Sequence, residues 1–356
     1  MKKNLAVGMV LLFLLLSPIF SQNEAEFKLV GQWKHEEIVG RDFFSYIDKD
    51  NHLVASLGRA GNLIITPDKV IKFAAFGQSP DELITLKTAF FYKGDLAMVE
   101  LAEKIKIFTK KGETYRWKET KWLKRGPWVH FIKEGLFFDN KFFLSGMEGI
   151  YEEKGPLKSF YKAFFHLKVY AENGDCLKQL IRKPYDGPTL VMMMRYHLAS
   201  YAKDRVFYLP ENELKLLVIS SKTLEVVKEV QLEVPSYYKK MPSTYYAWSD
   251  DQQQKSPAQQ SREYEDWQTG YSAVQEMVVD GKYLVIQIRT EQEKLKKFAL
   301  LFYNAENFKL ERTVFLDDFL FDVKDGKYYT YANGNPAIDE DTDDCIINIY
   351  AFEKKK

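Results

Sequence analysis

The sequence predicts an all-β protein, and three observations carry this prediction. Short apolar runs rich in Phe, Tyr, Val and Ile alternate with polar turn signals, while segments with helical spacing are few. A pair of hairpins recurs along the chain at intervals near 45 residues. One strand-like segment near the N-terminus has no hairpin partner of its own. Together they predict a six-bladed β-propeller of four-stranded antiparallel blades, closed by an N-terminal strand.

The first hairpin of each repeat is marked by a tight turn. Asp, Asn, Gly or Lys stands at each turn, where residues that tolerate positive φ are needed. Three of the five intervals between these turns agree within two residues, and the two longer ones contain inserts at 145–165 and 235–272. The six hairpins are 46–56, 90–99, 137–146, 200–210, 277–286 and 321–331.

A second hairpin follows each first one. The segments KIKIFTKKGE (104–113) and HLKVYAENGD (166–175) share one pattern of apolar, Lys, apolar, aromatic, small, polar, polar, Gly and acidic residues. The sixth repeat ends after its third strand, which would leave an unpaired outer edge. The segment EFKLVGQWKHE (26–36) can supply the missing strand, so we predict that it closes the ring.

The chain begins with the pattern of a secretory signal peptide. Lys2 and Lys3 precede an apolar run from Leu5 to Leu16, and Pro18 and Ser21 follow. The run is shorter than the roughly 20 residues that a membrane span needs. We therefore expect a signal peptide at 1–21, a single propeller domain at 22–356, and no membrane anchor after cleavage. The expected location is the periplasm or the extracellular space.

Composition excludes several classes of function. Of the 51 basic residues two lie in the signal peptide, which leaves 49 against 50 acidic residues and no global field for nucleic acid. The two cysteines, Cys176 and Cys345, cannot form a disulfide framework, and both are expected to be buried. We expect a monomer that binds no nucleic acid.

The link between the first two repeats carries a family resemblance. It reads FAAFGQSPDELI (73–84), and Phe76, Gly77, Pro80 and Glu82 follow in order the pattern Phe-Gly-x-Gly-Pro-Gly-Glu-Phe, from which Ser79, Asp81 and Leu83 depart. The chain thereby resembles the extracytoplasmic six-bladed propellers of bacteria related to the NHL-repeat and TolB-like groups. The resemblance implies a propeller over about 27–353 and export. Members of these groups serve mostly as binding platforms, with some lyases and lactonases.

One end of the predicted propeller carries all the long connections. Loops on a rigid scaffold are the usual place for function, so we expect a binding surface there. The longest, polar loop (235–272) is rich in aromatic residues, which suit contact with a protein or a glycan. The alternative is that these rings pin the loop to the propeller. The candidate binding residues are Trp122, Trp128, Tyr185, Tyr245, Tyr246, Trp248, Tyr264 and Trp267.

Three histidines suggest an alternative, catalytic function. His130, His166 and His197 are expected near the same end, where three imidazoles could hold zinc and leave a position open for water. No short metal-ligand motif supports this site, so no cofactor is expected, with a divalent metal, zinc or calcium, as the alternative. The sequence thus favours an exported, non-enzymatic platform for an envelope or extracellular protein or glycan. The competing hypothesis is a metal-assisted hydrolase or lyase at the channel mouth.

Overall fold

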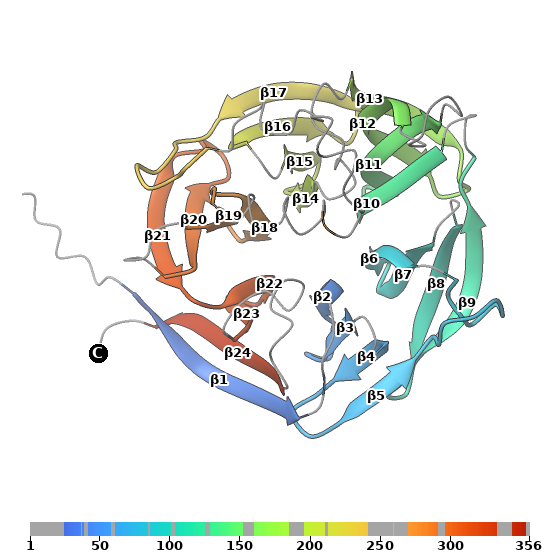
Figure 1. Cartoon of the computed structure of the whole chain (residues 1–356), viewed down its shortest axis with the longest axis horizontal. Helices are drawn as coiled ribbons and strands as arrows, with labels where there is room; N and C mark the ends of the chain where they lie inside the picture. The colour runs from blue at the N-terminus through green and yellow to red at the C-terminus, as the bar shows by residue number, and fades with distance from the viewer. Residues whose placement is uncertain are drawn as a thin grey trace, which may run out of the picture.

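A computed structural model shows six sheets arranged in a ring about a common axis (Figure 1). It describes residues 25–36, 38, 42–57, 61–84, 86–100, 104–124, 129–151, 160–184, 196–210, 213–240, 259, 270–290, 296–332 and 344–353. Within these ranges no helix has the length and apolar character needed to cross a membrane. Each sheet has four antiparallel strands, which confirms the predicted six-bladed β-propeller.

Five blades are each built from four consecutive strands of the chain, the first of them innermost, whereas blade 6 runs from the innermost β22 through β23 and β24 to the outermost β1 (Figure 1). The strands are, in blade 1, β2 (Asp42–Ile47), β3 (Leu53–Leu57), β4 (Asn62–Ile65) and β5 (Val70–Phe73); in blade 2, β6 (Leu86–Tyr92), β7 (Asp95–Glu100), β8 (Lys104–Lys111) and β9 (Thr114–Trp122); in blade 3, β10 (Val129–Phe138), β11 (Lys141–Tyr151), β12 (Phe160–Ala171) and β13 (Cys176–Pro184); in blade 4, β14 (Tyr196–Tyr201), β15 (Arg205–Pro210), β16 (Lys215–Ser220) and β17 (Glu225–Gln231); in blade 5, β18 (Val274–Asp280), β19 (Tyr283–Arg289), β20 (Phe298–Asn304) and β21 (Leu310–Leu316); and in blade 6, β22 (Phe319–Lys324), β23 (Lys327–Tyr331), β24 (Asp344–Glu353) and β1 (Glu26–Glu36).

The N-terminal strand closes the ring as predicted. Strand β1 pairs antiparallel with β24 from Glu26↔Glu353 to Glu36↔Asp344, and it is the outermost strand of blade 6. Side chains reinforce this pairing: Gln32 donates a hydrogen bond of 2.7 Å to Asn348. The Phe27 ring stacks on Tyr350 with centroids 5.1 Å apart. The first strand of the chain therefore covers the edge that the last strand would otherwise expose.

The two ends of the ring differ in the length of their connections. The tight-turn end carries turns with left-handed residues such as Asn51, Lys93 and Asn140, as their polar or Gly-flanked sequences predict. At the opposite, long-loop end, β17 stops at Gln231 and β18 starts at Val274. The predicted insert at 145–165 is partly strand, because the β11–β12 pairing continues to Tyr151↔Phe160.

The core lies between the blades rather than within one of them. Between blades 2 and 3, Phe90 and Tyr92 of β6 pack with Phe142 of β11. A Cβ atom on Gly135 would lie 2.5 Å from the Phe90 ring, so this glycine lets β10 approach β6. Cys345 is buried as expected, whereas Cys176 is exposed because it begins the outermost strand of its blade.

The packing of β1 yields a stability test. Replacing Phe27 with Ala should lower the free energy of unfolding by about 2 kcal/mol, because the half-buried ring contacts three other aromatic rings. Leu29→Ala on the same strand, where the side chain is 51% exposed, should change it by less than about 0.5 kcal/mol. Urea unfolding of both variants checks this. Equal losses would show that β1 is not held through Phe27.

Candidate functional site

The link that carries the family resemblance has a structural role. Gly77 donates a backbone hydrogen bond to Leu83, and the Ser79 amide donates one of 2.9 Å to the Glu82 carboxylate. This hydrogen bond lowers the pKa of Glu82. A Cβ on Gly77 would lie 2.1 Å from Glu82 Oε2, so the carboxylate occupies the space that the glycine leaves. The matching residues therefore shape the junction of blades 1 and 2.

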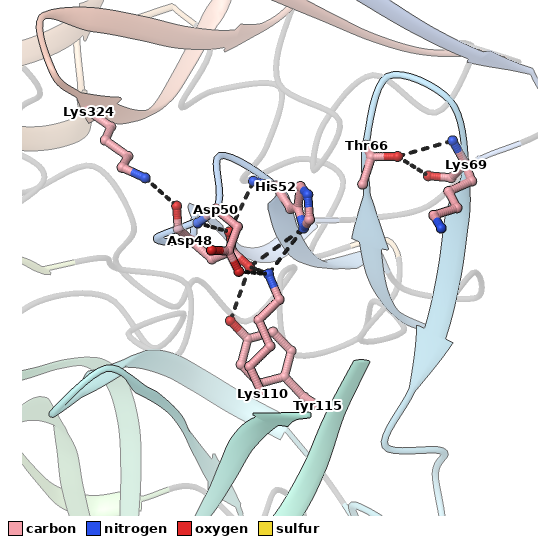
Figure 2. Close-up of polar contacts among 8 residues, drawn as sticks. All are labelled: Asp48, Asp50, His52, Thr66, Lys69, Lys110, Tyr115 and Lys324. Carbon is pink, nitrogen blue, oxygen red and sulfur yellow. Dashed lines mark hydrogen bonds and ion pairs between the residues drawn. The ribbon is translucent and has the colours of Figure 1, made fainter. Parts of the chain in front are cut away.

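A charged cluster at the tight-turn end joins three blades (Figure 2). The Lys110 ammonium of β8 lies 2.6 Å from Asp48 Oδ2, 2.5 Å from Asp50 Oδ2 and 3.1 Å from His52 Nδ1. Lys324 of β22 donates to the Asp48 carbonyl oxygen from the other side. Both Asp48 and Lys110 are buried. Two carboxylates and one imidazole thus surround an ammonium.

The charges of this cluster balance one another. The Lys110 hydrogen bond lowers the pKa of Asp50. Burial, followed by the Asp48 charge, raises the pKa of Tyr115, whose hydroxyl donates to Asp48. Because the ammonium already fills the space between the acidic groups, we assign the cluster a role in holding blades 1, 2 and 6 together. Sequence analysis missed it, although the Asp-Lys-Asp-Asn-His spacing of the turn was a visible signal.

The innermost strands present a second set of charged groups, at the centre of the ring. Glu134, Glu276 and Asp322 each stand just after a β-bulge, and each accepts the backbone N–H of the next residue at 3.2, 2.8 and 2.7 Å. Asp322 also accepts the Ile47 amide of blade 1 at 2.6 Å. Inner strands have an unpaired edge, so these carboxylates satisfy amides that no neighbouring strand can reach.

His197 lies beside one of these carboxylates. It is the second residue of β14, it is 4% exposed, and its Nδ1 is 3.8 Å from Glu276 Oε1. Its Nε2 is buried without a hydrogen-bond partner. Neither the sequence nor any short motif linked His197 to Glu276, which stands on the next blade. Only the ring arrangement brings them together.

The predicted three-histidine site stays a prediction. The backbone of His130 lies opposite Glu148 and that of His166 opposite Gly146, both in blade 3, while His197 is in blade 4. The side chains of His130 and His166 are not among those described. In the described part of the chain, no group of three His, Cys, Asp or Glu side chains is placed to hold a metal ion.

Of the predicted binding aromatics, the structure places Trp122. It is the last residue of β9, it is 62% exposed, and the Lys104 ammonium lies 4.6 Å from its ring centroid. Its carbonyl oxygen would lie 1.9 Å from a Cβ on Gly174, so Trp122 sits against the β12–β13 turn at the outer rim of blades 2 and 3. The other seven lie outside the described residues: Trp128, Tyr185, Tyr245, Tyr246, Trp248, Tyr264 and Trp267.

The two ends of the longest loop are held together on blade 5. The Lys239 amide donates to Ser272 Oγ at 3.0 Å, and the Ser272 amide donates to the Lys239 carbonyl at 2.8 Å. Beside this clamp, the Tyr237 ring packs on Phe315 with centroids 5.2 Å apart. Lys239 and Ser272, which flank this segment, are therefore fixed to each other at one point on blade 5. Tyr237 and Tyr238 pack against the core, as the pinning alternative predicts.

Comparison with known proteins supports the fold. No protein-family model and no curated protein sequence matches the chain. Among solved structures, a luciferin-regenerating enzyme aligns with a TM-score of 0.53 at 10% identity, covering 92% of this chain and 99% of that one. A protein described as exported from Bacteroides fragilis (0.48, 13%, covering 92% and 96%) and a streptogramin B lyase (0.48, 11%, covering 94% and 100%) also align. At these identities the likeness concerns the fold alone.

The Lys110 cluster yields a test with an internal control. Lys110→Met should lower the free energy of unfolding by about 3 kcal/mol, because it leaves the buried Asp48 carboxylate without its ammonium. Lys69→Met removes an exposed ion pair with Glu113 and should cost less than about 1 kcal/mol. Chemical denaturation of both variants measures these losses. If Lys110→Met lost no more free energy of unfolding than Lys69→Met, the Lys110 cluster would not hold the blades together.

Asp322 should make stability depend on pH. Burial raises its pKa from 3.8 to about 7, so its contribution to folding is largest below pH 3.8 and is lost as the pH rises towards 7. Asp322→Asn cannot ionise. Its free energy of unfolding, relative to the parent protein, should rise between pH 4 and pH 7 by one to a few kcal/mol, since each pKa unit is worth about 1.4 kcal/mol. Parallel urea-unfolding profiles across this range would exclude the effect.

Proposed function

We propose that the chain is an exported, non-enzymatic binding platform, which engages a protein or glycan of the cell envelope or the extracellular space through its long-loop end. The observation that carries this proposal is the clamp between Lys239 and Ser272. It fixes both ends of a long polar segment on a rigid blade, and rigid scaffolds that present long loops are a common design for binding.

The composition of the clamped segment supports a contact surface. It contains Tyr245, Tyr246, Trp248, Tyr264 and Trp267 among many polar residues. Tyr and Trp supply large contact areas together with a polar group, and they are enriched where proteins bind partners. Tyr237 and Tyr238 already secure the base of the segment, so the remaining rings are not needed for that task. Export is supported by the signal-peptide pattern at the N-terminus.

A loop replacement tests this function. Residues 241–269 are replaced with a short Gly-Ser linker between Lys240 and Gly270, which the clamp already holds close together. The thermal midpoint should stay within about 2 °C, because the residues that fix both ends of the segment, Lys239 and Ser272, are kept. Capture of a partner from an envelope fraction, or of a glycan from an array, should be lost.

A matched control variant carries Lys111→Ala at the opposite, tight-turn end, where the side chain is exposed. This variant should capture as the parent chain does. If the loop replacement still captures the same partner while melting normally, binding does not use the loop. If the parent chain captures nothing from either source, the platform proposal fails.

A further inference from the structure

A groove lies on the outer wall of the ring, between blades 1 and 2. Its two sides come from the outermost strands of these blades, β5 and β9, which pack side by side at the rim (Figure 1). The groove has a volume of about 250 Å³. Sites for drug-sized ligands usually enclose roughly 300–1,000 Å³, so this groove suits one ring-sized unit of a ligand.

The groove forms because the two strands differ in length. Strand β5 has four residues, whereas β9 has nine. Ala74 ends β5 with a φ of 43°, which is uncommon for a residue other than glycine. Asn62 holds this turn by donating a hydrogen bond of 2.6 Å to the Ala74 carbonyl oxygen. Part of the β9 face is therefore left without a strand opposite it.

Aromatic rings from both blades make the floor of the groove. Phe73 of β5, Phe108 of β8 and Tyr115 of β9 line it, and all three are buried. The Phe73 ring lies 5.5 Å from that of Tyr115 and 6.4 Å from that of Phe108, centroid to centroid. The Tyr115 hydroxyl donates to Asp48 in the Lys110 cluster. The floor is thus apolar, and its shape is fixed by packing before any ligand binds.

Trp117 presents an aromatic face at the side of the groove. It is 39% exposed, and its indole N–H donates a hydrogen bond of 3.2 Å to Thr120 Oγ1. Strand β9 bulges here, because Trp117 and Glu119 pair with consecutive residues of β8 and Lys118 is extra. Bulges turn side chains to new directions and are frequent beside functional sites. Since its N–H has a partner, the indole ring is left with its flat faces for a ligand.

Three charged side chains line the groove and have no ionic partner. Lys72, Asp81 and Arg116 form no ion pair or side-chain hydrogen bond with any residue that the structure describes. Other charged side chains of the outer strands are paired, as Lys118 is with Asp95 at 2.7 Å. Two cations against one carboxylate leave the groove with a net positive charge. It therefore favours an anionic ligand.

The lining selects among the classes of anionic ligand. An acidic peptide binds a sheet best by adding a strand to a straight free edge, but β5 has only four residues and β9 is interrupted by its bulge. A sugar needs no such edge. The partly positive C–H groups of its ring are attracted to the negative face of an indole, and its hydroxyl groups bind charged side chains. An acidic sugar therefore fits the groove better than a peptide.

We propose that the groove between β5 and β9 binds an acidic saccharide. One sugar ring stacks on Trp117, Lys72 and Arg116 bind its carboxylate or sulfate group, and Asp81 accepts hydrogen bonds from its hydroxyl groups. The site contains no residue of the 241–269 segment, so it holds or fails separately from the proposed function. It would give the side wall of the ring a glycan contact of its own.

Calorimetric titration of the mature full chain tests the site. The probes are tetragalacturonic acid and a hyaluronan tetrasaccharide, which carry carboxylates, and a sulfated chondroitin tetrasaccharide. The fully methylated ester of tetragalacturonic acid has the same rings without charge. Saturable binding of at least one acidic probe is expected, and about tenfold weaker binding of the uncharged ester. Binding of the sulfated probe alone assigns the anion as sulfate, and binding of the uronates assigns it as carboxylate; both support the site.

Variants connect the binding to the groove. Arg116→Gln and Lys72→Gln should each weaken it about tenfold, whereas Lys178→Gln, which removes an exposed cation from the outermost strand of blade 3, should leave it unchanged. Trp117→Leu should abolish it, while Trp117→Phe, which keeps an aromatic face, should retain most of it. A loss through packing alone would not distinguish these two substitutions.

Four results would overturn the proposal. The first is the absence of saturable binding of every acidic probe, and the second is equal binding of the uncharged ester. The third is tighter binding of a tetraglutamate peptide than of the saccharides, which would assign the groove to an acidic protein segment. The fourth is loss of saccharide binding when residues 241–269 are replaced, which would move the site to the long-loop end.

Discussion

The structure depends on one pairing, that of β1 with β24. Without it, blade 6 would have three strands and an open outer edge, and β1 would no longer link blade 6 to blade 1. The pairing joins residues at opposite ends of the chain, and it is backed by the Gln32–Asn348 hydrogen bond and the rings around Phe27. Since the core lies between blades, every inter-blade cluster needs a closed ring to exclude water.

The two ends of the closed ring differ in how their connections are held in place. At the tight-turn end, the ammonium groups of Lys110 and Lys324 bind the Asp48 turn to the neighbouring blades, so these charged groups stabilise the packing of the blades. At the long-loop end, the Lys239–Ser272 pair holds together the two ends of the longest connection. On the innermost strands, the carboxylates of Asp322 and Glu276 accept hydrogen bonds from backbone amides.

Much of the fold follows from the sequence because it is repeated locally. Turn residues recur at a regular period, and the unpartnered segment 26–36 had a single missing strand to fill. Sites built across blades could not be predicted in this way. Asp48, Lys110 and Lys324 come from three separate repeats, and His197 meets Glu276 only because their blades are adjacent. The rim position of Trp122 depends on its contact with the Gly174 turn, which no local pattern encodes.

The clamp between Lys239 and Ser272 has a consequence for how such a chain can diverge. With both ends held at one point, lengthening the segment between them adds only the slowly growing entropy of a longer closed loop, about 0.6 kcal/mol for each doubling. We therefore expect insertions and substitutions in this segment to change the free energy of folding little. Selection can therefore change what this end recognises while the six blades stay the same, so relatives with the same ring could differ completely in their ligands.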